Sequence, residues 1–292
     1  MKAPQFTRWL MHEDINFLLT NRIPRITLTR LMGWFSQIES PWLTRLSIAV
    51  WRLFTHLDLS DARETRFSSL HACFTRALKD GARPLDLRPD VLCSPCDAIV
   101  GAHGVIERGQ VLQAKGMAYS LDELLGADES ARMLGTLEGG SYVTLRLTSA
   151  MYHRFHAPAD LDVEHLTYIS GDTWNVNPIA LKRIERLFCR NERAVIRARL
   201  RDPDMRFLMV PVAAVLVASM RFHFADVLMN LRWRGPNRIA CDAAMRRGQE
   251  MGWFEHGSTI ILLLPPGFGI ASGIATGTGV RMGQALLQRT PA

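Results

Sequence analysis

Hydrophobic positions in the first sixty or so residues recur with the spacing of an amphipathic helix. One stretch places them at Leu28, Leu31, Met32 and Phe35, which lie on one helical face. A second stretch repeats the pattern at Leu43, Leu46, Val50, Leu53 and Phe54. Pro24 and Pro41 mark breaks, because proline disrupts a helix interior. The pattern predicts a helical segment over residues 1–60.

From about residue 90 the chain changes to short β-rich runs separated by glycine, proline, asparagine and aspartate. The clearest runs cover residues 142–147, 207–220 and 259–264. Continuous apolar runs such as Val-Ala-Ala-Val-Leu-Val-Ala are typical of strands covered on both faces. No internal repeat or linker divides the sequence. We expect a single α+β domain over residues 1–292, with a β-rich core of mixed or antiparallel sheets and a helical N-terminal segment.

Composition adds a preference for anionic partners. The chain has 292 residues, of which 48% are hydrophobic, and 35 Lys+Arg against 28 Asp+Glu give a net charge of +7. Such an excess favours contact with a phospholipid surface or nucleic acid. The predicted helices carry Trp34, Trp42 and Trp51 among arginines, a mixture suited to the boundary between acyl chains and headgroups. The alternative is that these helices pack on the rest of the protein.

Membrane crossing and an oxidising compartment are both disfavoured by the sequence. No apolar run reaches the roughly 20 residues that a spanning helix needs. Five cysteines form no regular framework, and the N-terminus lacks the layout of a signal peptide. We expect a reducing, cytosolic setting, with any membrane contact made from the surface.

Three short clusters carry candidate chemistry. Residues 152–158 contain His153 and His156, which suit acid/base or metal roles but are also common as structural side chains. Residues 93–97 contain a Cys-x-x-Cys followed by Asp97; zinc would need a second ligand pair, and no standard spacing supplies one. A thioredoxin-like redox role and two small buried side chains are the other readings of these cysteines.

The third cluster places Ser258 between Gly257 and an apolar run. Glycine permits the strained backbone from which the serine hydroxyl could attack the preceding carbonyl, forming an ester. Elimination of that ester would leave a dehydroalanine, which hydrolyses to a pyruvoyl group. Taken alone, Gly-Ser-Thr is most often a turn into a strand.

In combination the clusters resemble the bacterial phosphatidylserine decarboxylase family over nearly the whole chain. The order of the matching segments carries the resemblance. They are residues 112–116, 119–121, 152–154, 156–158, 175–177, 187–188, 190–193, 247–252 and 257–259. The chain departs from the family pattern at Ala98, Ala213 and Ala218, where glycine is usual, and at His256, where leucine is usual.

The resemblance implies a zymogen that cleaves itself between Gly257 and Ser258, giving a large chain of residues 1–257 and a small chain of residues 258–292. Ser258 would be the nucleophile and would become the covalent pyruvoyl cofactor, with His156 as its base and Asp97 orienting or charging that base. The family's reaction is decarboxylation of phosphatidylserine to phosphatidylethanolamine and carbon dioxide through a Schiff base. By the same analogy, His153 would supply the proton that replaces the carboxylate.

The resemblance also sets the expected partners. They are phosphatidylserine, an anionic membrane surface on the cytoplasmic side of the cell membrane, and further copies of the processed unit. No nucleic acid and no metal are expected. Two other functions fit the same residues: a serine hydrolase that uses Ser258, His156 and Asp97 on an external ester, and a non-catalytic peripheral membrane protein. Against the hydrolase, the sequence around Ser258 lacks the Gly-x-Ser-x-Gly elbow of many serine hydrolases.

Overall fold

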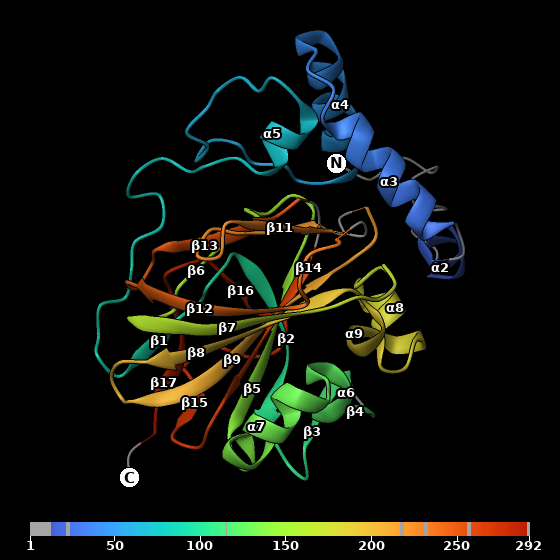
Figure 1. The fold of residues 1–292 in the computed structure, drawn as a ribbon. Coiled ribbons are helices and arrows are strands. Elements are labelled where there is room, and N and C mark those ends of the chain that lie inside the picture. Colours follow the sequence, from blue (N-terminus) through green and yellow to red (C-terminus); the bar gives the residue numbers. More distant parts are fainter. Residues whose placement is uncertain are drawn as a thin grey trace.

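The computed structural model describes residues 13–21, 24–114, 116–216, 219–230, 233–255 and 258–290. Helices form the N-terminal part, and sheets form most of the rest (Figure 1). The α+β prediction with a sheet-rich core is confirmed. The helices are α2 (Glu13–Asn21), α3 (Arg25–Ser36), α4 (Pro41–Phe54), α5 (Leu70–Phe74), α6 (Leu121–Leu125), α7 (Ala127–Leu137), α8 (Pro178–Arg183) and α9 (Leu187–Arg190).

An eight-stranded antiparallel sheet is the centre of the described fold. In spatial order its strands are β12 (Arg238–Met245), β7 (Leu161–Ile169), β8 (Arg193–Leu200), β9 (Met205–Ala213), β14 (Ser258–Leu264), β5 (Ser141–Leu147), β2 (Ala98–Val105) and β16 (Gly279–Val280). Strand β14 therefore lies inside the sheet, hydrogen-bonded to β9 on one side and β5 on the other. Every residue of β14 is buried, as the continuous apolar run predicted.

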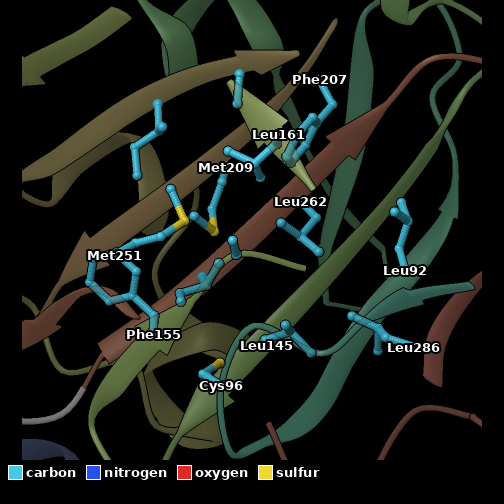
Figure 2. Close-up of a cluster of buried hydrophobic side chains, with 14 of the residues drawn as sticks. Leu92, Cys96, Leu145, Phe155, Leu161, Phe207, Met209, Met251, Leu262 and Leu286 are labelled. Atoms are coloured by element: carbon cyan, nitrogen blue, oxygen red, sulfur yellow. The ribbon is translucent and has the colours of Figure 1, made fainter. Parts of the chain in front are cut away.

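Alternate residues of the central strands pack into two separate cores. On β14, Ile260 and Leu262 belong to one core, whereas Ile261 and Leu263 belong to the other. Figure 2 shows the first core, where Leu262 lies among side chains from several strands. Because successive side chains of a strand point to opposite faces, this alternation shows which face of the sheet each residue of β14 occupies.

Three smaller sheets complete the strand-rich part. A four-stranded sheet has the order β11 (Val227–Asn230), β10 (Ser219–Phe222), β13 (Glu250–Phe254) and β6 (Arg154–His156). A three-stranded sheet has the order β1 (Val91–Cys93), β17 (Ala285–Arg289) and β15 (Phe268–Ile270). The pair β3 (Gln110–Ala114) and β4 (Met117–Ser120) forms a hairpin. These strand pairs are antiparallel as well.

One predicted strand is wrong. The apolar run 207–220 is divided between β9, which ends at Ala213, and β10, which begins at Ser219 in a different sheet. Between them the chain turns, and Leu216 adopts a left-handed backbone with φ of 70°. The sequence has no glycine or proline to mark this turn. Its side chains are apolar because they face a cavity, so they look like part of a strand. Ala218 lies outside the described residues.

Polar contacts are part of what attaches the N-terminal helices to the strand-rich part. Arg25 at the start of α3 pairs with Asp172 at 2.6 Å. The hydroxyl of Thr29 accepts a hydrogen bond from the backbone N–H of Leu216 at 3.0 Å. Ser40 caps α4, and Pro41 occupies the first helical turn, where a missing N–H is tolerated. Among the described residues, no helix has both the length and the apolar character needed to span a bilayer.

Candidate active site

Ser258 is the first residue of β14 and is fully buried. Its backbone is opposite Leu147 of β5 and Ala213 of β9. Within the described part of the chain, its Oγ has no hydrogen-bond partner, which is costly for a buried hydroxyl unless the group has another use. The sheet therefore holds the backbone of Ser258 rigidly and leaves its hydroxyl available for chemistry. Gly257 and His256, which the sequence placed at the cleavage site, lie outside the described residues.

His153 lies close in the fold to the segment that leads into Ser258. The backbone N–H of Phe254, at the end of β13, donates to the carbonyl of His153 at 3.0 Å. The imidazole Nδ1 is 2.8 Å from the carbonyl of Met151, which makes Nδ1 the protonated nitrogen of the neutral ring. The ring is fully buried and lies against Phe74. His153 is thus a fixed imidazole whose Nε2 can exchange a proton.

His156 is held by both ring nitrogens. Its Nδ1 is 2.9 Å from the carbonyl of Gly248, and its Nε2 is 2.9 Å from the hydroxyl of Tyr152. A carbonyl only accepts, so Nδ1 donates to Gly248 and Nε2 accepts from Tyr152. Burial lowers the pKa of His156 below its usual value, although the bond to Gly248 and the carboxylate of Asp97 act in the opposite direction. The neutral imidazole, which is the form a general base needs, is therefore favoured.

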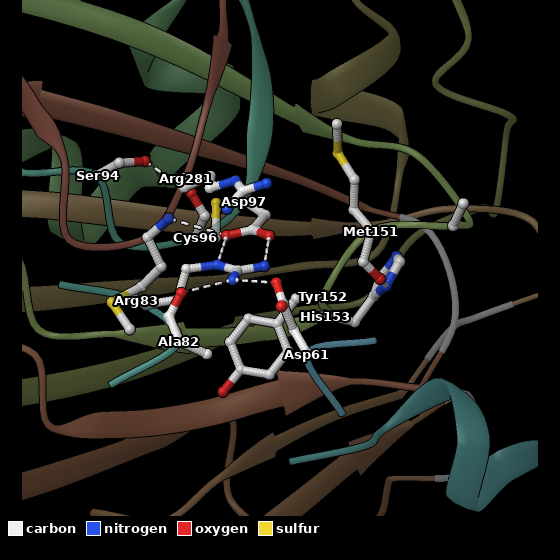
Figure 3. A network of polar contacts seen from close by, with 12 residues as sticks. Asp61, Ala82, Arg83, Ser94, Cys96, Asp97, Met151, Tyr152, His153 and Arg281 are labelled. Atoms are coloured by element: carbon white, nitrogen blue, oxygen red, sulfur yellow. Dashed lines mark hydrogen bonds and ion pairs between the residues drawn. The ribbon is translucent and has the colours of Figure 1, made fainter. Parts of the chain in front are cut away.

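Asp97 is bound by an arginine that the sequence analysis did not single out. The Arg83 guanidinium donates to both carboxylate oxygens at 2.9 and 2.6 Å, and the N–H of Met282 donates to one of them at 2.9 Å. Arg83 also pairs with Asp61 at 2.9 Å (Figure 3). These carboxylates raise the pKa of Arg83 against the effect of its burial. The ring of His156 donates a hydrogen bond to the carbonyl of Gly248 and accepts one from Tyr152, so Asp97 acts on that ring through its charge.

A backbone contact links the loop of Asp97 to the strand of His156. The N–H of His156 donates to the carbonyl of Pro95 at 2.8 Å. Strand β6 is in turn paired with β13, and Arg154 on β6 makes an ion pair with Glu250 on β13 at 2.9 Å. The structure thus places the loop 93–97, the histidine segment and the strand that precedes Ser258 in one connected region.

An apolar cavity of about 990 Å³ lies beside this region. Helices α3, α4 and α5 form one wall, with Met32, Phe35, Val50 and Phe54 among the lining side chains. The opposite wall comes from the end of β5 and from residues 214–216, which follow β9. These two segments flank Ser258, because Leu147 and Ala213 are its partners on β5 and β9. The cavity therefore lies between the helices and the two segments that flank the start of β14.

The cysteine cluster has the properties of core side chains. Cys96 is fully buried, and burial raises the pKa of both Cys93 and Cys96, so their thiols stay protonated and unreactive. Among the described residues, no group of three or more histidine, cysteine or acidic side chains converges on a metal-sized site. The motif's contribution to the region is the position it gives Asp97.

Sequence reasoning missed several residues that the structure brings into the site. Arg83, Tyr152 and Gly248 are the direct partners of Asp97 and His156. Phe74 lies against His153 and lines the cavity. Tyr152 and Gly248 lie inside motifs that were recognised, but only the folded chain shows what they contact.

Comparison with known proteins gives one consistent family. A model of the phosphatidylserine decarboxylase family matches residues 70–288. Similar proteins include the phosphatidylserine decarboxylase proenzymes of Yersinia pestis (strain Pestoides F) and Yersinia pseudotuberculosis serotype O:1b (strain IP 31758). Each is 32% identical over 293 residues, covering 96% of this chain and 98% of the relative.

Proposed function

The chain belongs to the phosphatidylserine decarboxylase family, and we propose that it converts phosphatidylserine to phosphatidylethanolamine and carbon dioxide with a pyruvoyl group made from its own Ser258. The observation that carries the proposal is the buried Oγ of Ser258, which has no hydrogen-bond partner among the described residues. Ser258 begins a central strand, and the preceding strand, β13, is paired with the histidine segment. Residue 258 fits a pyruvoyl group, because converting this hydroxyl removes no hydrogen bond found among the described residues.

Self-cleavage uses the chain's own groups. The Oγ of Ser258 attacks the carbonyl carbon of residue 257, and its proton passes to Nε2 of His156, which must first release the hydroxyl of Tyr152. His156 then gives that proton to the amide nitrogen of residue 258, which leaves as an amine and so produces an ester. Loss of the Cα proton breaks the Cβ–Oγ bond and releases residues 1–257 with a carboxylate end. Water then replaces the nitrogen of the dehydroalanine, and this nitrogen departs as ammonia. His156 begins as the neutral base, and the charge of Asp97 favours its protonated form during the reaction.

For decarboxylation, a pyruvoyl group supplies a carbonyl that takes up the electron pair left as carbon dioxide departs. The protein's part is to bind the lipid in a dry cavity, to exclude water, and to return a proton to the carbon that lost the carboxylate. We assign that proton to Nε2 of His153, since Nδ1 is committed to the carbonyl of Met151. Phe74 keeps this ring beside the cavity.

We further propose that α3 and α4 bind the anionic, cytoplasmic face of the cell membrane, from which the lipid enters the cavity. Large apolar side chains on these helices are exposed, including Trp34 at 65%, Trp42 at 73% and Leu53 at 75%. Arg45 and Arg52 on α4 are exposed beside them and would meet lipid phosphates. The processed unit is expected to form a homo-oligomer on that surface.

Intact mass spectrometry of the denatured protein tests the function, with Ser258→Ala as its control. The proposal requires two chains divided before residue 258, the smaller one lighter by the mass of ammonia than the simple hydrolysis product. The purified protein must also release carbon dioxide from phosphatidylserine, and the Ser258→Ala chain must stay whole and inactive. An uncut wild-type chain whose Ser258 reacts with serine-directed inhibitors would instead identify a hydrolase.

A further inference from the structure

The cavity beside Ser258 contains one charged side chain that no self-cleavage or proton-transfer step uses. Among the described residues that line it, Arg146 alone is ionisable, and the other walls are apolar or neutral. Burial lowers the pKa of Arg146, and no carboxylate in the described part of the chain opposes that effect. A half-buried guanidinium without an anion is unfavourable, because it gives up hydration and gains no partner.

Other shielded arginines of the described chain are paired. Arg83 meets Asp97, Arg154 meets Glu250, and Arg197 meets Glu129 at 2.8 Å. Arg76 and Arg193 donate to backbone carbonyls instead. Arg146 differs from all of these, since its guanidinium has neither a carboxylate nor a carbonyl contact within the described residues and lines a cavity large enough for a ligand.

The register of the sheet places Arg146 relative to Ser258. Arg146 is opposite Thr259, and Leu147 is opposite Ser258, with regular pairing along the whole of β5 and β14. Side chains of paired residues share a face, so Arg146 and Thr259 point to one side of the sheet and Ser258 points to the other. Both Arg146 and Leu147 line the cavity, although they point to opposite faces of the sheet. We infer that the cavity extends around the end of β5.

This separation selects the anion. In phosphatidylserine, the carboxylate is attached to the carbon that reacts at residue 258, so it must lie at the reacting centre. The phosphorus is three bonds farther along the headgroup, and the acyl chains follow it. Arg146 is one residue before Leu147, the β5 partner of Ser258, and points to the other face of the sheet, so its guanidinium suits the phosphate. The apolar wall of α3 and α4 suits the acyl chains. Arginine binds phosphate oxygens in a bidentate manner, which also fixes orientation.

We propose that Arg146 binds the phosphate of the phospholipid substrate within this cavity. This inference rests on the proposed function for the identity of the substrate. Arg146 is then the contact that anchors the headgroup while the serine portion reaches residue 258. Binding a phosphodiester inside an apolar cavity also gives Arg146 a counter-ion, which the described residues do not supply.

Steady-state decarboxylation of a short-chain phosphatidylserine, kept below its micelle concentration, measures the contact without surface partitioning. Arg146→Met should be cut at Ser258 like the wild type but should show a KM raised by about 10- to 100-fold, with kcat changed far less. Arg146→Lys should recover part of the affinity. The matched control is Arg132→Met, which removes the same charge from an exposed position on α7 and should leave both constants unchanged.

An analogue whose phosphate carries a methyl group, and so no charge, identifies the anion. Wild-type protein should bind it as weakly as Arg146→Met binds the natural lipid, and Arg146→Met should not distinguish the two lipids. An unchanged KM in Arg146→Met, or continued discrimination against the uncharged analogue, would overturn the proposal. A loss confined to kcat would do so as well, because it would assign Arg146 to the carboxylate.

Calorimetry separates this inference from the proposed function. A short-chain phosphatidylglycerol has the same phosphodiester but no amine to react, and the Ser258→Ala chain cannot be processed. The test compares binding of this lipid to Ser258→Ala and to the double variant Ser258→Ala/Arg146→Met. Binding that is about 10-fold or more weaker in the double variant supports the phosphate site even if no decarboxylation is found. Equal binding by the two chains refutes it even if the enzyme decarboxylates.

Discussion

The imidazole of His153 lies against the phenyl ring of Phe74, with ring centroids 3.9 Å apart. Phe74 in turn stacks on Trp51 of α4, with centroids 5.8 Å apart. Both Phe74 and Trp51 line the cavity. The three rings therefore connect the helix that we place at the membrane with the imidazole that we assign to proton transfer.

Shortening Phe74 should slow decarboxylation without preventing maturation. In Phe74→Leu the imidazole loses its contact with the aromatic ring and can shift, so kcat should fall roughly 10- to 100-fold while processing at Ser258 stays complete. Phe207→Leu removes a ring from the buried face of β9 and serves as the control, because it should lower stability but not kcat. A kcat for Phe74→Leu equal to that of the control would contradict the assignment.

Removing Arg83 should leave Asp97 as an unpaired buried charge. The Arg83 and Asp97 side chains are only 8% and 10% exposed, so Arg83→Met should cost about 3 to 5 kcal/mol in the free energy of unfolding. Urea denaturation in the uncleaved Ser258→Ala background measures this, and adding Asp97→Asn should restore part of the loss. Arg88→Met breaks an exposed pair with Asp86 and should leave the free energy of unfolding nearly unchanged. Similar losses for the two arginines would refute the argument.

The hydroxyl of Tyr152 should set the pH range of self-cleavage. Burial already lowers the pKa of His156, and the bond that Nε2 accepts from Tyr152 further favours the neutral ring. Tyr152→Phe removes that bond, so the pKa of His156 should rise toward its usual value. Because the base is active when neutral, the midpoint of the rate against pH should move upward. Single-turnover cleavage of freshly refolded precursor gives this midpoint, and a midpoint that stays or falls would contradict the proposed contact.

Glu192 should make the fold less stable as the pH rises. Burial raises the pKa of Glu192 to about 7, although Tyr168 donates a hydrogen bond to one of its oxygens. The folded state therefore holds a proton that the unfolded state has released, and stability present below the unfolded pKa is lost as the pH rises through about 7. The loss should approach about 3 kcal/mol. Urea denaturation at pH values from 4 to 8 should show a smaller decline in Glu192→Gln; equal declines would exclude the effect.

The exposed apolar face of α4 should control membrane binding. Leu53→Glu should weaken sedimentation with anionic vesicles by roughly 10-fold, since it removes an interfacial side chain and adds a repelled charge. Leu87→Glu is the matched control: Leu87 is 77% exposed, against 75% for Leu53, but lies outside the helices. Equal effects of the two substitutions would show that net charge alone is responsible.

Much of the sheet could be predicted because burial on both faces leaves a simple signal. The run that forms β14 is apolar throughout, as a central strand must be. The same signal failed at residues 207–220, since Val215 and Leu216 are apolar for a different reason: they turn beneath the helices and line the cavity. A local pattern reports burial, but not whether the chain continues straight.

The sequence named the candidate reactive residues but not the contacts that position them. Asp97, His153, His156 and Ser258 were named from motifs, yet the partners that position Asp97 and His156 are distant in sequence or neutral in character. Arg146 gave no signal, because a polar residue within an alternating strand is normally on a solvated face. Only the folded chain shows that this face is enclosed, by the second core and by the cavity.

The place of β14 between β5 and β9 has a consequence for the lifetime of the mature enzyme. In the processed form that we propose, the small chain would supply the middle of the largest sheet, and β17 of the same chain pairs with β1. Once the peptide link is gone, refolding requires two separate molecules to meet, and the high effective concentration of the precursor is lost. Unfolding therefore becomes one-way at cellular dilution, and persistence depends on the rate of opening rather than on an equilibrium. The precursor can refold after it opens, whereas the processed enzyme, once its two chains separate, must be replaced by new synthesis.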